Sequence, residues 1–232
     1  MNPLNTTRTL PVPPGARRPS ALGADNPAAA KVLRNTYALL SLTLLFSAGV
    51  AATAMAMGWR SPGLVITLVG YFGLLFAVHK LQNSGWAIPT VFALTGFMGY
   101  TLGPMLAATL ALPGGALTIA TALGATGATF LALSAYVLTT RKDFSFMGGF
   151  LFAGMVVAII LGLGAVFFEM PALGLAVSGL VALLSVGLIL FETSRIVNGG
   201  ETNYVLATVG LFVSVFNLFV SLLNLIGIGS SD

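Results

Sequence analysis

Apolar runs of about 20 residues follow one another along most of this sequence, and only short polar breaks separate them. Each run is long enough to cross the roughly 30 Å hydrocarbon core of a bilayer as a helix. The runs predict seven membrane spans, which cover residues 37–57, 62–81, 86–108, 117–138, 146–168, 172–196 and 204–228. We therefore expect an all-α integral membrane protein.

The composition supports this fold class. Hydrophobic residues make up 57% of the chain and charged residues 7%, whereas soluble globular chains carry about 25% charged residues. The breaks between the runs are too short to hold a folded module, so residues 31–232 are predicted to form one seven-helix transmembrane domain. The 28 glycines favour close helix packing, and "GYTLG", with Gly99 and Gly103, has the spacing of such a contact.

The first 30 residues differ from the rest. They include "PVPPGARRPS", which is proline-rich and basic and offers few apolar anchors. Such a segment cannot bury enough surface to offset the entropy of ordering it, so residues 1–30 are predicted to be a disordered tail. A cleaved signal peptide is disfavoured, because the first apolar run is longer than an ordinary signal sequence and begins after more than 30 residues.

Lysine and arginine are distributed unevenly if the spans alternate sides. One side has only Arg60. The other side receives Arg8, Arg17, Arg18, Lys31, Arg34, Lys80, Arg141, Lys142 and Arg195. The positive-inside rule then places the amino terminus in the cytoplasm and the carboxy terminus outside.

Several kinds of chemistry lack the residues they need. The chain has no cysteine and one histidine, His79, so neither a thiolate nor a zinc site is expected. No phosphate-binding motif, catalytic constellation or contiguous basic face is evident, which argues against an enzyme and against a nucleic-acid partner. No cofactor or metal is expected, and the oligomeric state is not predicted.

The stretch "FETSRIVNGGETN" places charges directly against an apolar run. Glu192 and Arg195 are three residues apart, so they are neighbours on one helix face. The helix should end at "NGG", with Thr202 or Asn203 as N-cap of the last span. Two interpretations remain open for Glu192: an interfacial ion pair with Arg195, or a proton-responsive carboxylate that faces the bundle interior.

The run "SRIVNGGETNYVLATV" and the later "NLFVSLL" resemble the carboxy-terminal signature of the Bax inhibitor-1 family, and within it the bacterial YccA-type modulators of the FtsH protease. The resemblance extends over residues 37–232. It implies a seven-helix bundle whose last helix is central, a cytoplasmic amino terminus, a place in the bacterial inner membrane and the FtsH protease complex as partner.

Calcium-leak members of this family carry an aspartate pair, and the resemblance places Glu192 and Ser214 at the two positions. Two nearby carboxylates can share a proton, whereas a carboxylate and a hydroxyl do so weakly. Asn217 is expected to hydrogen-bond another helix or to line a cavity, and His79 to lie at the interface or to sense pH. We expect a non-enzymatic regulator of FtsH; the alternative is a pH-sensitive calcium or cation leak channel.

Overall fold

The computed structural model describes residues 27–229, which contain seven α-helices, one 3-10 turn and no strand. The elements are α1 (Pro27–Ala56), α2 (Leu64–Leu81), α3 (Ala87–Leu110), α4 (Gly115–Thr140), η1 (Ser145–Met147), α5 (Gly148–Phe167), α6 (Pro171–Val197) and α7 (Tyr204–Gly229). All seven α-helices are long and apolar enough to cross a membrane. Each predicted span overlaps one of them, so the predicted all-α bundle is confirmed.

The first helix begins earlier than the sequence suggested. α1 starts at Pro27, and proline is tolerated there because the first turn of a helix needs no backbone N–H donor. Residues 27–30, which we assigned to the tail, therefore belong to α1. The other tail residues, 1–26, lie outside the described residues, and their disorder stays a prediction.

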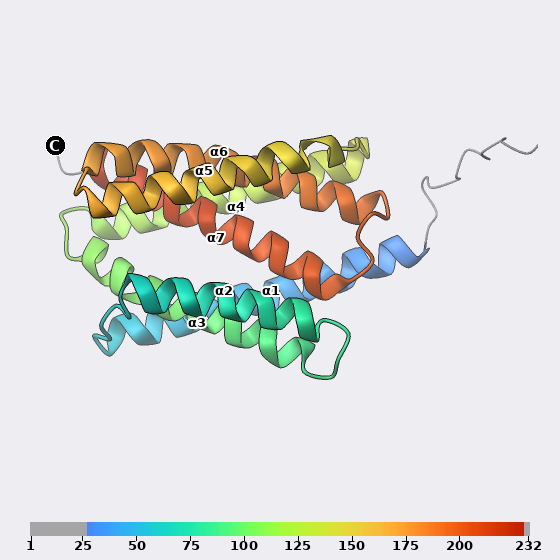
Figure 1. The fold of residues 1–232 in the computed structure, drawn as a ribbon, viewed down its shortest axis with the longest axis horizontal. Coiled ribbons are helices and arrows are strands. Elements are labelled where there is room, and N and C mark those ends of the chain that lie inside the picture. Colours follow the sequence, from blue (N-terminus) through green and yellow to red (C-terminus); the bar gives the residue numbers. More distant parts are fainter. Residues whose placement is uncertain (1–26, 230–232) are drawn as a thin grey trace, which may run out of the picture.

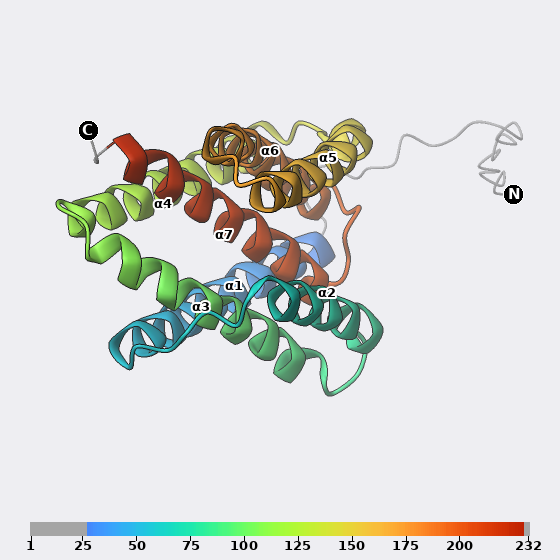
Figure 2. The same ribbon diagram turned by 60° about the vertical axis from the view of Figure 1, so that its left-hand side comes forward.

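The last helix runs through the middle of the bundle. Figure 1 shows α1, α2 and α3 on one side, α4, α5 and α6 on the other, and α7 crossing obliquely between them; the turned view in Figure 2 agrees. α7 packs against α6, α1 and α4, and less extensively against α3. Its Leu211, Phe212 and Leu223 are almost completely buried. The central position that the resemblance implied for the last helix is thus observed.

Glycines bring α1 and α3 into close contact. A Cβ atom at Gly99 would overlap the backbone oxygen of Ser47, and one at Gly103 would overlap the Cβ atom of Ala54. Small residues allow this approach in a membrane, where no hydrophobic effect draws helices together. The close contact predicted from "GYTLG" is confirmed, and its partner is α1.

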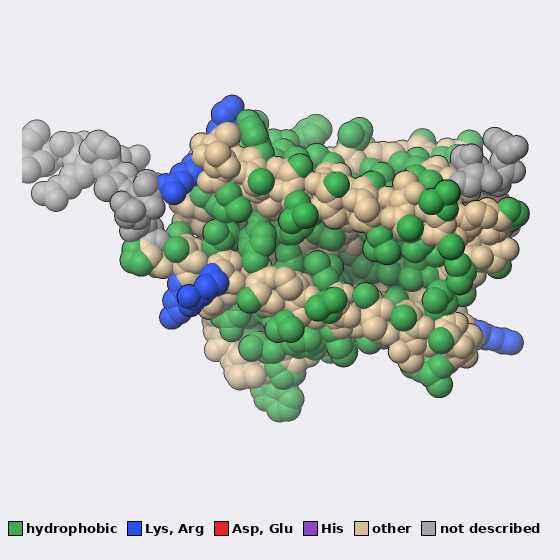
Figure 3. Space-filling model, turned by 180° about the vertical axis from the view of Figure 1, so that it is seen from behind, with side chains coloured by type: hydrophobic (Ala, Val, Ile, Leu, Met, Phe, Trp, Pro, Cys, Tyr) green, Lys and Arg blue, Asp and Glu red, His purple; other side chains and the backbone are tan. Residues whose placement is uncertain are grey.

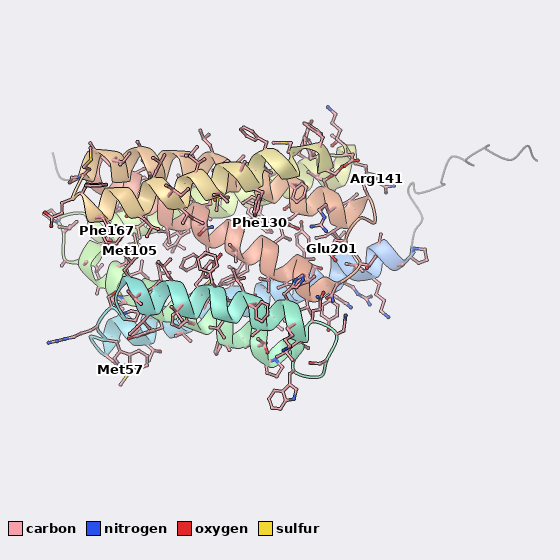
Figure 4. The ribbon with its side chains drawn as sticks, viewed as in Figure 1. Met57, Met105, Phe130, Arg141, Phe167 and Glu201 are labelled. Carbon is pink, nitrogen blue, oxygen red and sulfur yellow. The ribbon has the colours of Figure 1, made fainter. Side chains whose placement is uncertain are left out.

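Charged side chains gather at one end of the bundle, which we call the basic end. It contains the start of α1 and the loops α2–α3, α4–α5 and α6–α7, and Figure 3 shows the concentration of basic side chains there. In residues 27–229 the basic residues of this end are Lys31, Arg34, Lys80, Arg141, Lys142 and Arg195. Arg60 follows α1 at the opposite end. In Figure 4, Arg141 and Glu201 mark the basic end, whereas Met57 and Phe167 mark the other.

Candidate functional site

The α6–α7 connection turns sharply and returns its acidic residue to the end of α6. α6 ends at Val197, and Gly199 has a φ of 74°, a conformation that glycine adopts readily. The N–H groups of Gly200 and Glu201 both donate to the carbonyl oxygen of Arg195, at 2.8 and 3.0 Å. The predicted helix end at "NGG" is confirmed, and the turn places Glu201 beside Arg195.

The guanidinium of Arg195 lies between two carboxylates. Its Nη2 is 3.0 Å from Oε2 of Glu201, and its Nη1 is 3.8 Å from Oε2 of Glu192. The two carboxylate side chains are 12% and 15% exposed. The expected pair between Glu192 and Arg195 is therefore present, but the shorter contact is with Glu201, which we did not predict from the sequence. Two carboxylates share one guanidinium, so acidic side chains outnumber basic ones in the cluster.

Glu192 also contacts the central helix. A Cβ atom added to Gly210 of α7 would lie 2.9 Å from Cδ of Glu192, so only glycine leaves room for this carboxylate in its present position. Ser214 is buried one turn further along α7, and its Oγ donates to the carbonyl oxygen of Gly210 at 2.9 Å. The two positions that the resemblance paired, Glu192 and Ser214, thus both contact Gly210 of α7.

Asn203 joins two loops of the basic end. Its Oδ1 accepts the backbone N–H of Val205 at 2.9 Å, so Asn203 caps α7, and the choice between Thr202 and Asn203 is settled. Its Nδ2 donates to Oε1 of Gln82 at 3.2 Å and to Oδ1 of Asn83 at 3.1 Å. These two acceptors precede α3 by a few residues. Asn203 therefore ties the α2–α3 loop to the start of the central helix.

Ser194 joins the third loop to α6. Its Oγ accepts the backbone N–H of Phe144 at 2.9 Å and donates to the carbonyl oxygen of Lys142 at 3.1 Å. In the same α4–α5 loop, Oδ1 of Asp143 accepts the N–H of Ser145 at 2.8 Å, and this hydrogen bond holds the pKa of Asp143 below its ordinary value. Hydrogen bonds thus connect the α2–α3 loop to the α6–α7 loop, and the α4–α5 loop to the end of α6.

The remaining predicted site residues do not join this cluster. His79 is exposed in the last turn of α2, next to Lys80. Asn217 is half-buried on α7, two turns beyond Gly210, and it makes no hydrogen bond within residues 27–229. Of the two roles expected for Asn217, a hydrogen bond to another helix is not present among the described residues, and the cavity-lining role stays a prediction.

The cluster suits ion pairing and hydrogen bonding more than metal binding. In the part of the chain that the structure describes, no three histidine, cysteine or acidic residues lie close enough to hold a metal ion. Glu192 and Glu201, the two acidic residues that do approach each other, are both oriented toward Arg195. The arrangement can fix the geometry of the loops and can place a carboxylate against α7.

The chain is similar to known proteins over most of its length. The profile of the family described as "Inhibitor of apoptosis-promoting Bax1" matches residues 29–231. The chain belongs to the Bax inhibitor-1 family. It is 54% identical over 202 residues to the modulator of FtsH protease YccA of Escherichia coli K12, covering 87% of this chain and 92% of that protein. A membrane protein of Vibrio cholerae is 48% identical, with 87% and 91% covered.

The chain is also 54% identical over 202 residues to the inner membrane protein YccA of Escherichia coli O6:H1, and the match covers 87% of this chain and 92% of that protein. Members of this family are therefore similar to the chain over its whole bundle. The family membership predicted from the "SRIVNGGETNYVLATV" run is confirmed, and the protein is a multi-pass membrane protein.

Proposed function

We propose that the protein is a non-enzymatic inner-membrane regulator that binds the membrane-anchored FtsH protease and modulates it. The observation that carries the proposal is the 54% identity to a modulator of FtsH protease, over 92% of that protein's length. The site geometry supports a regulator, because Arg195, Ser194 and Asn203 are all engaged in contacts that hold helices and loops together.

Reconstitution with purified FtsH tests this proposal. With both proteins in one lipid nanodisc or vesicle, we expect the chain to bind FtsH and to slow its degradation of a membrane-protein substrate. A seven-helix protein of unrelated sequence at the same density is the control for crowding of the bilayer. An unchanged degradation rate together with no detectable association would contradict the proposal.

The orientation is part of the proposal. The basic residues gather at one end of the bundle (Figure 3), and the positive-inside rule assigns that end to the cytoplasm. We expect a reporter fused after Asp232 to be active only on the outer side, and a reporter fused before α1 to be active only in the cytoplasm. The reverse pattern would show that the charge distribution does not set the topology of this chain.

A leak pathway for cations is the second candidate, and one observation favours it. In the described bundle, five buried side-chain hydroxyls make no hydrogen bond, and they belong to Thr36, Tyr37, Ser134, Ser185 and Thr193. Buried polar groups usually have partners, and interior water is one way to supply them. One of the five, Thr193, directly follows Glu192 on α6.

Glu192→Gln separates the two candidates, since glutamine keeps the size of the side chain and removes its charge. For a regulator, we expect association with FtsH to be unchanged and stability to fall by only about 0.2–1 kcal/mol, because the substitution removes a single ion pair, the 3.8 Å pair with Arg195. For a leak, the pH dependence of calcium flux in proteoliposomes should disappear, because the amide cannot titrate. Wild-type protein that gives no flux above empty liposomes excludes the leak.

A further inference from the structure

Two adjacent basic side chains of the α4–α5 loop have no acidic partner within the described bundle. Arg141 and Lys142 are both exposed, and neither forms an ion pair in residues 27–229, where both ion pairs belong to Arg195. Figure 4 shows Arg141 at the basic end of the bundle. The positive-inside rule explains on which side of the membrane these cations lie, and it says nothing about what they bind there.

The acidic groups of the basic end do not neutralise this loop. Glu192 and Glu201 are both oriented toward Arg195. Asp143 follows Lys142 directly, but its Oδ1 accepts the backbone N–H of Ser145 at 2.8 Å. One carboxylate also cannot balance two cations, so the loop keeps a net positive charge.

The loop backbone that carries the two cations is held in place. Arg141 has a φ of 53° at the end of α4, and Oγ of Ser194 bonds both the carbonyl oxygen of Lys142 and the N–H of Phe144. The Nζ of Lys142 lies 5.7 Å from the centre of the Tyr136 ring, which is within the range of a cation–π contact. A pre-organised loop loses less conformational freedom when it binds a ligand.

Exposed aromatic side chains flank the cations on the side of the membrane. Phe146 and Phe150 are four residues apart at the start of the fifth span, and they are 80% and 71% exposed. Tyr136, in the last turns of α4, is 42% exposed. Aromatic residues are typical of the boundary between headgroups and hydrocarbon. We call these residues the α4–α5 patch, which consists of Tyr136, Arg141, Lys142, Phe146 and Phe150.

The α4–α5 patch matches the two parts of a phospholipid. Its cations lie in a loop just beyond the ends of two membrane-spanning helices, where lipid phosphates are found. Its phenylalanines continue from the loop into the apolar span. A free phosphate ion would use the cations alone, and an acidic protein segment would stay in the water above the phenylalanines. Basic groups at this depth favour lipids whose headgroups carry a net negative charge.

We propose that the α4–α5 patch binds an anionic phospholipid, whose phosphate contacts Arg141 and Lys142 and whose acyl chain packs against Phe146 and Phe150. The inference does not depend on the proposed function, because it requires only the bilayer in which the bundle lies. Ser194 connects the loop to α6, so a bound lipid stabilises the native arrangement of this end of the bundle.

The first test measures lipid binding to the purified full-length chain by native mass spectrometry. We expect phosphatidylglycerol to bind more tightly than phosphatidylcholine. Arg141→Ala should weaken phosphatidylglycerol binding by about 5-fold, and Arg141→Ala with Lys142→Ala by about 30-fold, because each basic group near the surface contributes about one such factor.

Lys31→Ala with Arg34→Ala is the matched control for charge. Both residues are exposed at the same end of the bundle, on α1, and their replacement removes the same charge while it leaves the α4–α5 patch intact. Binding of phosphatidylglycerol should be unchanged. An equal loss in the two double variants would show that the whole basic end attracts lipid without a site, and it would overturn the proposal.

The second test separates a lipid from a free phosphate. Phe146→Ser with Phe150→Ser should weaken phosphatidylglycerol binding, whereas Phe167→Ser with Phe168→Ser, exposed to 75% and 76% at the other end of α5, should not. The soluble headgroup glycerophosphoglycerol should not displace the lipid at equal concentration. Displacement, or equal binding by both phenylalanine variants, would show that the acyl chain plays no part and would overturn the proposal.

The third test uses the lack of cysteine in the chain, which permits a single label without background. A benzophenone label at Phe146→Cys, in bilayers that contain phosphatidylglycerol, should form adducts with that lipid in excess of its share of the bilayer. Lys31→Ala with Arg34→Ala should leave this excess intact, and Arg141→Ala with Lys142→Ala should remove it. Adducts in proportion to bilayer composition, or adducts with protein alone in native membranes, would overturn the proposal, the latter in favour of an acidic protein segment.

Discussion

Gly99→Ala is expected to force α1 away from α3 and to destabilise the bundle by about 1–3 kcal/mol, as overpacking does in well-packed interiors. The new Cβ atom would overlap the backbone oxygen of Ser47, and a backbone atom can move only if its helix moves. In the double variant Gly99→Ala with Gly103→Ala, most of the protein should be unfolded. Gly103 of α3 faces Ala54, which lies on α1 like Ser47, so both new Cβ atoms push against α1. Unfolding in mixed detergent micelles measures both changes.

Gly73→Ala on α2 is the matched control, because nothing lies within 4 Å of a Cβ atom there. It should leave stability unchanged or raise it by up to about 1 kcal/mol, since alanine favours the helix over glycine. Ser47→Ala should not rescue Gly99→Ala, because the overlapping atom belongs to the backbone. Equal stabilities of the Gly99 and Gly73 variants would show that the α1–α3 contact does not depend on a missing side chain.

The sequence predicted the seven helices because each bilayer crossing requires a long apolar run, and the runs are separated by recognisable turn residues. Local signals also predicted details of the α6–α7 connection. Gly199, two residues after Val197, marked the end of α6, and Thr202 and Asn203 both had the side chain of an N-cap, of which the structure uses Asn203. These features depend on neighbouring residues alone, so they can be inferred without the fold.

The rest of the site depends on which residues meet across the bundle. Glu201 reaches Arg195 only because the turn at Gly199 reverses the chain, and Asn203 meets Gln82 and Asn83 across more than a hundred residues. α7 carries apolar residues on every side, so periodicity could not show whether Asn217 would face another helix or a cavity.

The basic end is joined to the central helix by Glu192. Its carboxylate occupies the space that a side chain at position 210 of α7 would fill. The α6–α7 turn, in which Arg195 bonds Glu201, leads directly into α7. A change in this cluster should therefore act on stability and on the position of α7.

Arg195→Ala should be the most destabilising single change at the basic end, because it leaves Glu192 and Glu201 next to each other without a cation. Removing one partner of a fully buried ion pair costs about 3–5 kcal/mol, and an exposed pair contributes only about 0.2–1 kcal/mol. The two carboxylates are 15% and 12% exposed, and Arg195 is 33% exposed. We therefore expect a loss of about 1–3 kcal/mol in the free energy of unfolding.

Arg195→Lys is the conservative control, since lysine keeps the charge but lacks the planar fork that reaches two carboxylates at once. Its stability should fall between those of the wild type and Arg195→Ala. In the Glu192→Gln background the cost of Arg195→Ala should be smaller, because only Glu201 is then left unpaired, and a double-mutant cycle measures the difference. An equal cost in both backgrounds would show that the 3.8 Å contact between Arg195 and Glu192 contributes nothing and that Glu201 alone holds the guanidinium.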